Sequence, residues 1–125
     1  MKRDWDIIRE ILIKLEEATS ADDRLRLSSF PIERAQEISY HVELLIEAGL
    51  INGQMVKTLG PGPYDFFAER LTWDGHEFLD SIRSDTIWQR TKSVFISKGL
   101  SMTFDLVKSV AVDFASAFLK TTISS

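Results

Sequence analysis

The feature that most limits the fold is a helix that ends at a glycine and passes at once into an extended segment. The stretch YHVELLIEAGLING, residues 40–53, keeps its apolar side chains on one helical face as far as Ala48. Gly49 suits the left-handed cap conformation, and Leu50 or Ile51 then folds back over the last turn. The sequence therefore predicts a helix over residues 32–48, a glycine cap, and a strand that begins directly after it.

The segment after this cap has the composition of a β-hairpin. Residues 55–59 and 66–71 both have strand character, and GPGPYD, residues 60–65, contains two prolines and two glycines. Such a composition excludes regular secondary structure and favours a turn. Two strands joined by a turn of this kind form a hairpin. We therefore expect strands over Met55–Leu59 and Phe66–Leu71.

Two elements are expected before the central helix. Apolar residues at helical spacing predict a helix from Asp4 to Glu17. The segment TSADD, residues 19–23, is expected to form a loop after it. In RLRLSSF, Arg24–Phe30, polar and apolar residues alternate, which predicts a short half-buried strand.

Helices are expected again after the hairpin. Thr72 and Ser84 are suitable N-caps for two of them, and Gly99 ends the second. Ser101 or Thr103 then caps a last helix that runs to about residue 120. No repeat or linker interrupts this order, so one α+β domain followed by a terminal helix is expected.

Composition excludes several classes of function. The chain has 125 residues, of which 44% are hydrophobic and 27% are charged, as in an ordinary globular domain with one core. Its net charge of −4 provides no overall basic field toward nucleic acid or an anionic membrane. The absence of cysteine excludes disulfides and thiolate chemistry. The charged start, MKRDWDIIRE, lacks the apolar run of a signal peptide, so we expect a cytoplasmic protein.

Three motifs of the chain resemble those of a known family. These motifs are MKRDWDIIREIL, ISYHVELLIEAGLI and RLTWDGHEFLDSIRSDTIW. They are similar to a set of small bacterial and prophage proteins catalogued as a domain of unknown function. The resemblance implies a winged-helix fold and a mobile-element origin, and it brings no established activity. With the order of elements, it predicts a winged helix-turn-helix domain over residues 1–98. Residues 99–125 then form a hydrophobic C-terminal helix for dimerisation or partner docking.

A winged helix usually places the helix before the hairpin in the major groove of DNA. The residues expected to contact duplex DNA or a protein partner are Gln36, Ser39, Tyr40, Lys57 and Tyr64. The same helix carries four glutamates against one arginine, Arg34, which is a poor match for phosphates. Two functions remain open. One is a phage- or prophage-derived DNA-binding transcriptional regulator, and the other is a protein–protein interaction module without DNA binding, whose partner is a host or phage protein.

The terminal helix over residues 103–120 has an apolar arc of about two-thirds of its circumference, whereas a helix on one core needs roughly 100°. Three placements are open: the helix is buried on two sides within its own domain, packs on its own domain and also on a partner, or lies on or in a membrane. Charged residues within it disfavour a membrane span. We expect a homodimer, because a two-fold pair of helices buries the surplus apolar surface. The expected interface residues are Phe104, Val107, Val110, Phe114 and Phe118.

No pattern predicts an enzyme, a metal site or a cofactor. His41 and His76 each lack a partner at the spacing of metal ligands. Three carboxylates gather in the first turns of one helix, where negative charge is favoured in any case. They are Asp74, Glu77 and Asp80. The tryptophans, which we expect in the core or at an interface, are Trp5, Trp73 and Trp88.

Overall fold

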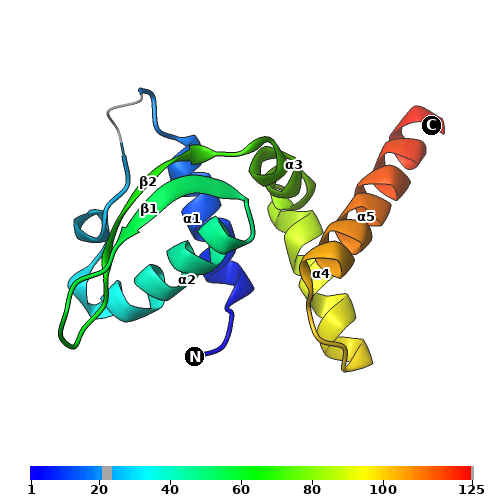
Figure 1. The fold of residues 1–125 in the computed structure, drawn as a ribbon. Coiled ribbons are helices and arrows are strands. Elements are labelled where there is room, and N and C mark those ends of the chain that lie inside the picture. Colours follow the sequence, from blue (N-terminus) through cyan, green and yellow to red (C-terminus); the bar gives the residue numbers. More distant parts are fainter. Residues whose placement is uncertain (21–23, 125) are drawn as a thin grey trace. The chain divides into compact units, whose positions relative to one another are not determined.

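The computed structural model describes residues 1–20 and 24–124, with side chains described as far as Thr121. Over these residues the fold is α+β, with five α-helices and one antiparallel pair of strands (Figure 1). Most of the loop expected over residues 19–23 lies outside the described residues. The chain divides into two compact units, residues 1–77 and residues 78–125. The fourth and fifth helices lie in one unit, and the domain division that the sequence predicts after residue 98 stays a prediction.

Helix α1, Trp5–Glu16, begins where Asp4 caps it. The Asp4 carboxylate accepts hydrogen bonds from the backbone N–H of Asp6 (2.9 Å) and of Ile7 (3.3 Å). These bonds satisfy amides that have no partner within the helix. The apolar face of α1 packs against α2 and β2, and its buried side chains are Ile7, Ile8, Ile11, Leu12 and Leu15.

The strand expected over Arg24–Phe30 is wrong except at one residue. Leu25 forms an isolated antiparallel bridge with Ala68, and Leu27–Ser29 is a 3-10 turn. Side chains accept hydrogen bonds from the backbone N–H groups that a longer strand would pair with its neighbour. The Ser29 hydroxyl accepts from Arg26 N–H at 3.0 Å, and the Asp65 carboxylate accepts from Leu27 N–H at 3.0 Å. Such local bonds compete with sheet pairing.

The central helix and its cap form as expected, with one change at the start. Residues Ile32–Arg34 are a 3-10 turn, and the α-helix proper, α2, spans Ala35–Glu47. Gly49 has φ 74°, in the left-handed region. Leu50 N–H donates to the Leu45 carbonyl at 3.0 Å, and its side chain is buried. The helix end in the motif EAGLI is therefore a glycine cap with an apolar residue folded over it.

The hairpin is confirmed, but its first strand was placed wrongly. Strand β1 spans Ile51–Val56 and pairs with β2, Asp65–Leu71, so the expected strand Met55–Leu59 starts too late. Asn52 and Gly53 resemble a turn in the sequence, yet they lie in β1 at a shift of register. A Cβ atom on Gly53 would lie 2.4 Å from the Phe67 carbonyl oxygen. Glycine is therefore required there by close backbone contact and not by a turn.

Helix α3, Trp73–Ile82, starts in direct contact with the end of α2. The Thr72 hydroxyl donates to the Gly49 carbonyl at 2.6 Å and accepts from Gly75 N–H at 3.0 Å. Thr72 N–H donates to the Leu50 carbonyl at 3.0 Å. We call these four residues, Gly49, Leu50, Thr72 and Gly75, the α2–α3 junction. The family motifs EAGLI and LTWDG thus meet at one contact.

The second unit contains the end of α3, helix α4 (Asp85–Lys98) and helix α5 (Phe104–Ser124). The Ser84 hydroxyl caps α4 by accepting from Ile87 N–H at 3.3 Å, and Gly99 ends it with φ 65°. Both caps are as expected, as is Thr103 before α5. Buried apolar side chains come from all three helices, and they are Phe78, Leu79, Ile82, Trp88, Phe95, Val107 and Ala111. Crossing a bilayer needs a longer apolar run than any helix offers in the part of the chain that the structure describes.

Candidate interaction surfaces

Three of the expected contact residues meet where α2 packs against the hairpin. Ser39 is buried, and its hydroxyl donates to the Tyr64 carbonyl at 2.8 Å. The Lys57 ammonium lies 2.9 Å from the Glu43 carboxylate and 5.7 Å from the centroid of the Tyr64 ring. Ser39 therefore ties α2 to Tyr64, the residue just before β2, and its hydroxyl does not lie at the surface.

The other two expected contact residues differ in exposure. Gln36 is exposed on α2, whereas Tyr40 is half-buried with its ring edge-on to His41, 5.4 Å between centroids. His41 is buried, and its Nε2 accepts from Asp4 N–H at 2.8 Å. Because Nε2 accepts, Nδ1 must carry the proton and donate to the Glu37 carbonyl at 2.6 Å. His41 thus joins the start of α1 to α2.

Arg34, just before α2, is held by two carboxylates. Its Nη1 and Nη2 atoms donate to Glu10 at 2.7 and 2.8 Å, and its Nε donates to Glu37 at 2.9 Å. The hydrogen bonds from Arg34 hold the pKa of the Glu10 carboxyl below its usual value. The same pairing, led by Glu10, raises the pKa of Arg34. The positive charge of Arg34 is therefore neutralised within the chain.

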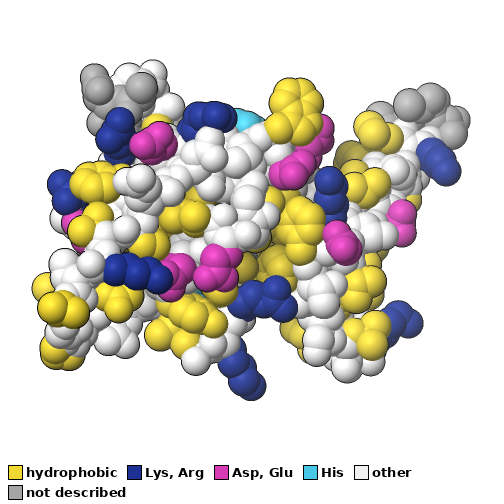
Figure 2. All heavy atoms as spheres, viewed as in Figure 1, with side chains coloured by type: hydrophobic (Ala, Val, Ile, Leu, Met, Phe, Trp, Pro, Cys, Tyr) yellow, Lys and Arg dark blue, Asp and Glu magenta, His cyan; other side chains and the backbone are white. Residues whose placement is uncertain are grey.

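The cations of the hairpin are paired in the same way. Hydrogen bonding to Glu43 raises the pKa of Lys57. Arg26 lies 2.8 Å from the Asp65 carboxylate and 4.5 Å from the centroid of the Phe67 ring. Burial raises the pKa of Asp65, but hydrogen bonds from two backbone amides and from Arg26 together lower it below its usual value. Figure 2 shows basic and acidic side chains side by side over α2 and the hairpin.

An open apolar groove of about 580 Å³ lies between the 3-10 turns, the start of α2 and the hairpin. Ile32 is 85% exposed at this groove, and Val56 is 37% exposed. Its apolar lining consists of Leu27, Phe30, Ile32, Ala35, Val56 and Pro63. Apolar anchors of protein partners fill such grooves, whereas DNA phosphates require free cations and amides.

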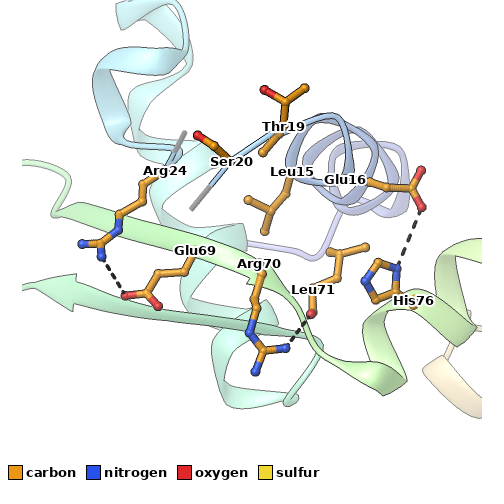
Figure 3. A pocket seen from close by; sticks show the side chains of 10 residues that line it. Leu15, Glu16, Thr19, Ser20, Arg24, Glu69, Arg70, Leu71 and His76 are labelled. Carbon is orange, nitrogen blue, oxygen red and sulfur yellow. Dashed lines mark hydrogen bonds and ion pairs between the residues drawn. The ribbon is translucent and has the colours of Figure 1, made fainter. Parts of the chain in front are cut away.

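A second pocket, of about 530 Å³, lies between the end of α1, β2 and the start of α3 (Figure 3). Arg24 faces Glu69 at 4.0 Å, and His76 faces Glu16 at 3.9 Å. Arg70 donates to the Leu71 carbonyl at 3.4 Å. The described residues contain no group of three or more His, Cys, Asp or Glu placed to hold a metal ion. This arrangement is that of a surface hollow lined by polar and charged side chains.

The expected dimer residues of α5 lie mostly on the face that packs within the chain. Val107 is fully buried, and Phe104 stacks on Phe78 with 4.7 Å between ring centroids. Phe114 and Phe118 line a small pocket beside the start of α4, and Val110 is half-buried. Val107 and Phe104 therefore contribute to the packing of their own unit. Phe118 is 64% exposed despite its place in that pocket.

The exposed apolar surface of α5 lies on the two flanks of this inward face. Val112 is 44% exposed and Leu119 is 58% exposed, and their spacing of seven residues puts them on the same flank. Leu106, 48% exposed, lies on the other flank. The helical wheel contains these residues, but only the positions of α3 and α4 decide which part of the apolar arc faces inward.

Comparison with known proteins gives one family and one near relative. The family model described as "Hypothetical protein (DUF2513)" matches residues 2–101. The chain is 41% identical over 119 residues to an uncharacterized protein of Haemophilus influenzae, covering 95% of this chain and 99% of that protein. The likeness to this relative therefore extends into α5, beyond the family model. No solved structure matches the chain.

Proposed function

We propose, for a chain that belongs to the DUF2513 family, a non-enzymatic protein–protein interaction module built on a winged-helix scaffold. The scaffold is supported by the order of α1, the Leu25 bridge, the 3-10 turns, α2 and the hairpin. In this assignment α2 is the recognition helix and the segment between β1 and β2 is the wing. A prophage origin belongs to the same proposal and rests on sequence resemblance alone.

The pairing of the cations on α2 and the hairpin is the observation that carries this proposal. Contacts to DNA phosphates come from lysine and arginine side chains that exchange their counterions for phosphates. Here Arg34 is held by Glu10 and Glu37, and Lys57 by Glu43, all at 2.9 Å or less. Moving either cation to a phosphate would leave its carboxylates facing the duplex. The adjoining apolar groove suits a protein better.

The wild-type chain is therefore expected to bind random duplex DNA more weakly than about 10⁻⁴ M even at 50 mM salt, the weak end of ordinary non-specific affinity. Fluorescence anisotropy of a labelled 20-base-pair duplex, titrated at several salt concentrations, measures this. The double variant Glu43→Gln, Glu47→Gln releases Lys57 and removes two negative charges. It should bind measurably more tightly than the wild type.

Tight binding by the unmodified chain, with affinity that falls steeply as salt rises, would contradict the proposal. That result would instead support the alternative, a DNA-binding transcriptional regulator. The variant Asp113→Asn, Lys120→Gln provides a control, because it changes two exposed charges on α5, in the second unit, and none on α2 or the hairpin. It should not change DNA affinity.

We also propose that one partner is a second copy of the chain, through the flank of α5 that contains Val112 and Leu119. A two-fold pair buries the same flank of both helices. Sedimentation equilibrium should show a dimer at micromolar concentrations, and Val112→Ser with Leu119→Ser should give a monomer. The variant Asp113→Ser, Lys120→Ser changes two exposed residues with the same seven-residue spacing on the polar side of α5, and it should remain dimeric. A wild-type chain that is still monomeric at about 100 µM would rule out this dimer. A dissociation constant of about 100 µM corresponds to an association free energy of only 5–6 kcal/mol.

A further inference from the structure

Trp73 differs from the other two tryptophans of the chain. Trp5 lies beside the Arg3 guanidinium, 5.2 Å from the ring centroid, and the buried Trp88 has the Lys92 ammonium at 5.5 Å. Trp73 is 77% exposed, and among the described residues no cation lies over its ring. A large exposed aromatic side chain at a fixed position is a typical anchor for a binding partner.

Two carboxylates follow Trp73 within the next four residues of α3. Glu77 is four residues after Trp73 on α3 and so shares its face, and Asp74 is the next residue along the helix. Both are exposed, and neither has a salt bridge within the described residues. Figure 2 shows a hydrophobic side chain standing beside acidic ones over the start of α3. The helix N-terminus supplies about half a positive charge, so two carboxylates leave the local field negative.

The backbone that carries the ring is held in place before any partner arrives. Thr72 is bound to Gly49 and Leu50 through its hydroxyl and its amide, and it caps α3 through Gly75. Trp73 is the first residue of α3 after this cap. A partner therefore does not have to order this backbone when it binds, which reduces the entropic cost of association.

The chain itself shows what an aromatic ring with a neighbouring carboxylate binds. Arg26 lies over Phe67 while it pairs with Asp65, and Lys57 lies over Tyr64 while it pairs with Glu43. Each is a set of one ring, one carboxylate and one cation. The start of α3 carries an aromatic ring and carboxylates of the same kinds within five consecutive residues.

We propose that Trp73, Asp74 and Glu77 form a binding site for an arginine side chain of a partner protein. Arginine fits best because its planar guanidinium stacks on an indole and also donates in parallel to a carboxylate. This inference rests on the proposed function and deepens it by naming the chemistry of the partner. The site consists of residues of the first unit alone.

The test uses the full chain and an acetylated, amidated octa-arginine peptide. The indole N–H signal of Trp73 in a ¹H–¹⁵N spectrum is assigned from its absence in the Trp73→Phe variant. Octa-arginine should shift this signal in a saturable way and leave the signals of Trp5 and Trp88 nearly unchanged. The same peptide with citrulline in place of arginine keeps the shape and loses the charge, and it should shift none of the three.

Affinities come from the anisotropy of the labelled peptide. The double variant Asp74→Asn, Glu77→Gln should weaken binding about 3- to 10-fold, as expected for two exposed ion pairs. Trp73→Ala should weaken it by a similar factor through loss of the cation–π contact. The charge-matched control Glu33→Gln, Glu47→Gln removes two exposed carboxylates near and on α2 and should change affinity less than about twofold.

Three results with the peptides and the control variant would overturn the inference. They are an unmoved Trp73 signal, equal binding of the citrulline peptide, and an equal loss of affinity in the Glu33 and Glu47 control. A larger shift of Trp73 with neutral phosphatidylcholine vesicles than with octa-arginine would assign the ring to a membrane surface and also overturn it. Failure of the arginine-site experiments would not change the result of the duplex-DNA titration. The two tests therefore distinguish failure of this inference from failure of the proposed function.

Discussion

The variant Gly75→Ala is expected to lose at least about 3 kcal/mol of stability, at the upper end of what overpacking usually costs. A Cβ atom on Gly75 would lie 1.9 Å from the Leu50 carbonyl oxygen and 3.0 Å from its carbonyl carbon. Both are backbone atoms, so no side chain can rotate away. Relief requires the start of α3 to move off the end of α2, which stretches the Thr72 hydrogen bonds to Gly49 and Leu50.

Thermal unfolding followed by circular dichroism should show a fall of the midpoint by roughly 10 °C or more. The matched control is Gly99→Ala, where a Cβ atom meets nothing within 4 Å but φ is 65°. That substitution should cost only about 1–2 kcal/mol, the ordinary penalty of the left-handed conformation. A Gly75→Ala chain as stable as the wild type would show that the α2–α3 junction is not closely packed.

The variant His41→Ala is expected to lose about 2–4 kcal/mol of stability, which combines a cavity with unpaired backbone groups. The ring is 1% exposed, and both nitrogens are hydrogen-bonded to backbone. Removing it leaves Asp4 N–H without its acceptor at the residue that caps α1. Chemical denaturation monitored by fluorescence of the tryptophans measures the loss, and the start of α1 should exchange its amide hydrogens faster.

Two further substitutions at His41 separate packing from hydrogen bonding. Glutamine keeps an acceptor at the end of the side chain and should recover more than half of the loss, whereas leucine fills the volume without an acceptor. If leucine were as stable as glutamine, the bond to Asp4 would contribute little. In ¹⁵N spectra of the wild-type ring, Nδ1 should carry the proton, as the acceptor role of Nε2 requires.

The elements that the sequence predicts well are those set by neighbouring residues. Ser84 and Gly99 bound α4 as expected, and Gly49 ends α2, because caps depend on side chains within one turn. The strands are less predictable. Asn52-Gly53 has the composition of a turn, but pairing with β2 across the hairpin makes it part of a strand. Leu25 pairs with a residue 43 positions away, and no local pattern sets that distance.

The candidate surfaces also combine features set by neighbouring residues, which the sequence predicts, with features set by distant residues, which it does not. The exposure of Gln36 follows from helical periodicity, and so does the surplus apolar arc of α5. The burial of Ser39 does not, because it depends on the hairpin returning to place the Tyr64 carbonyl beside the hydroxyl. The pairing of Arg34 with Glu10 joins residues 24 positions apart. A count of charges over residues 32–48 shows one arginine, Arg34, and only the fold shows that its charge is already neutralised.

The α2–α3 junction also decides where the chain can be divided for study. A fragment that stops at the end of the hairpin, at Leu71, would retain the Gly49 and Leu50 carbonyls but lose the Thr72 groups that bind them. It would also lose Gly75, whose lack of a side chain lets helix and loop touch. Any shortened gene intended to encode the first unit must therefore carry codons beyond the last strand, into the helix that follows.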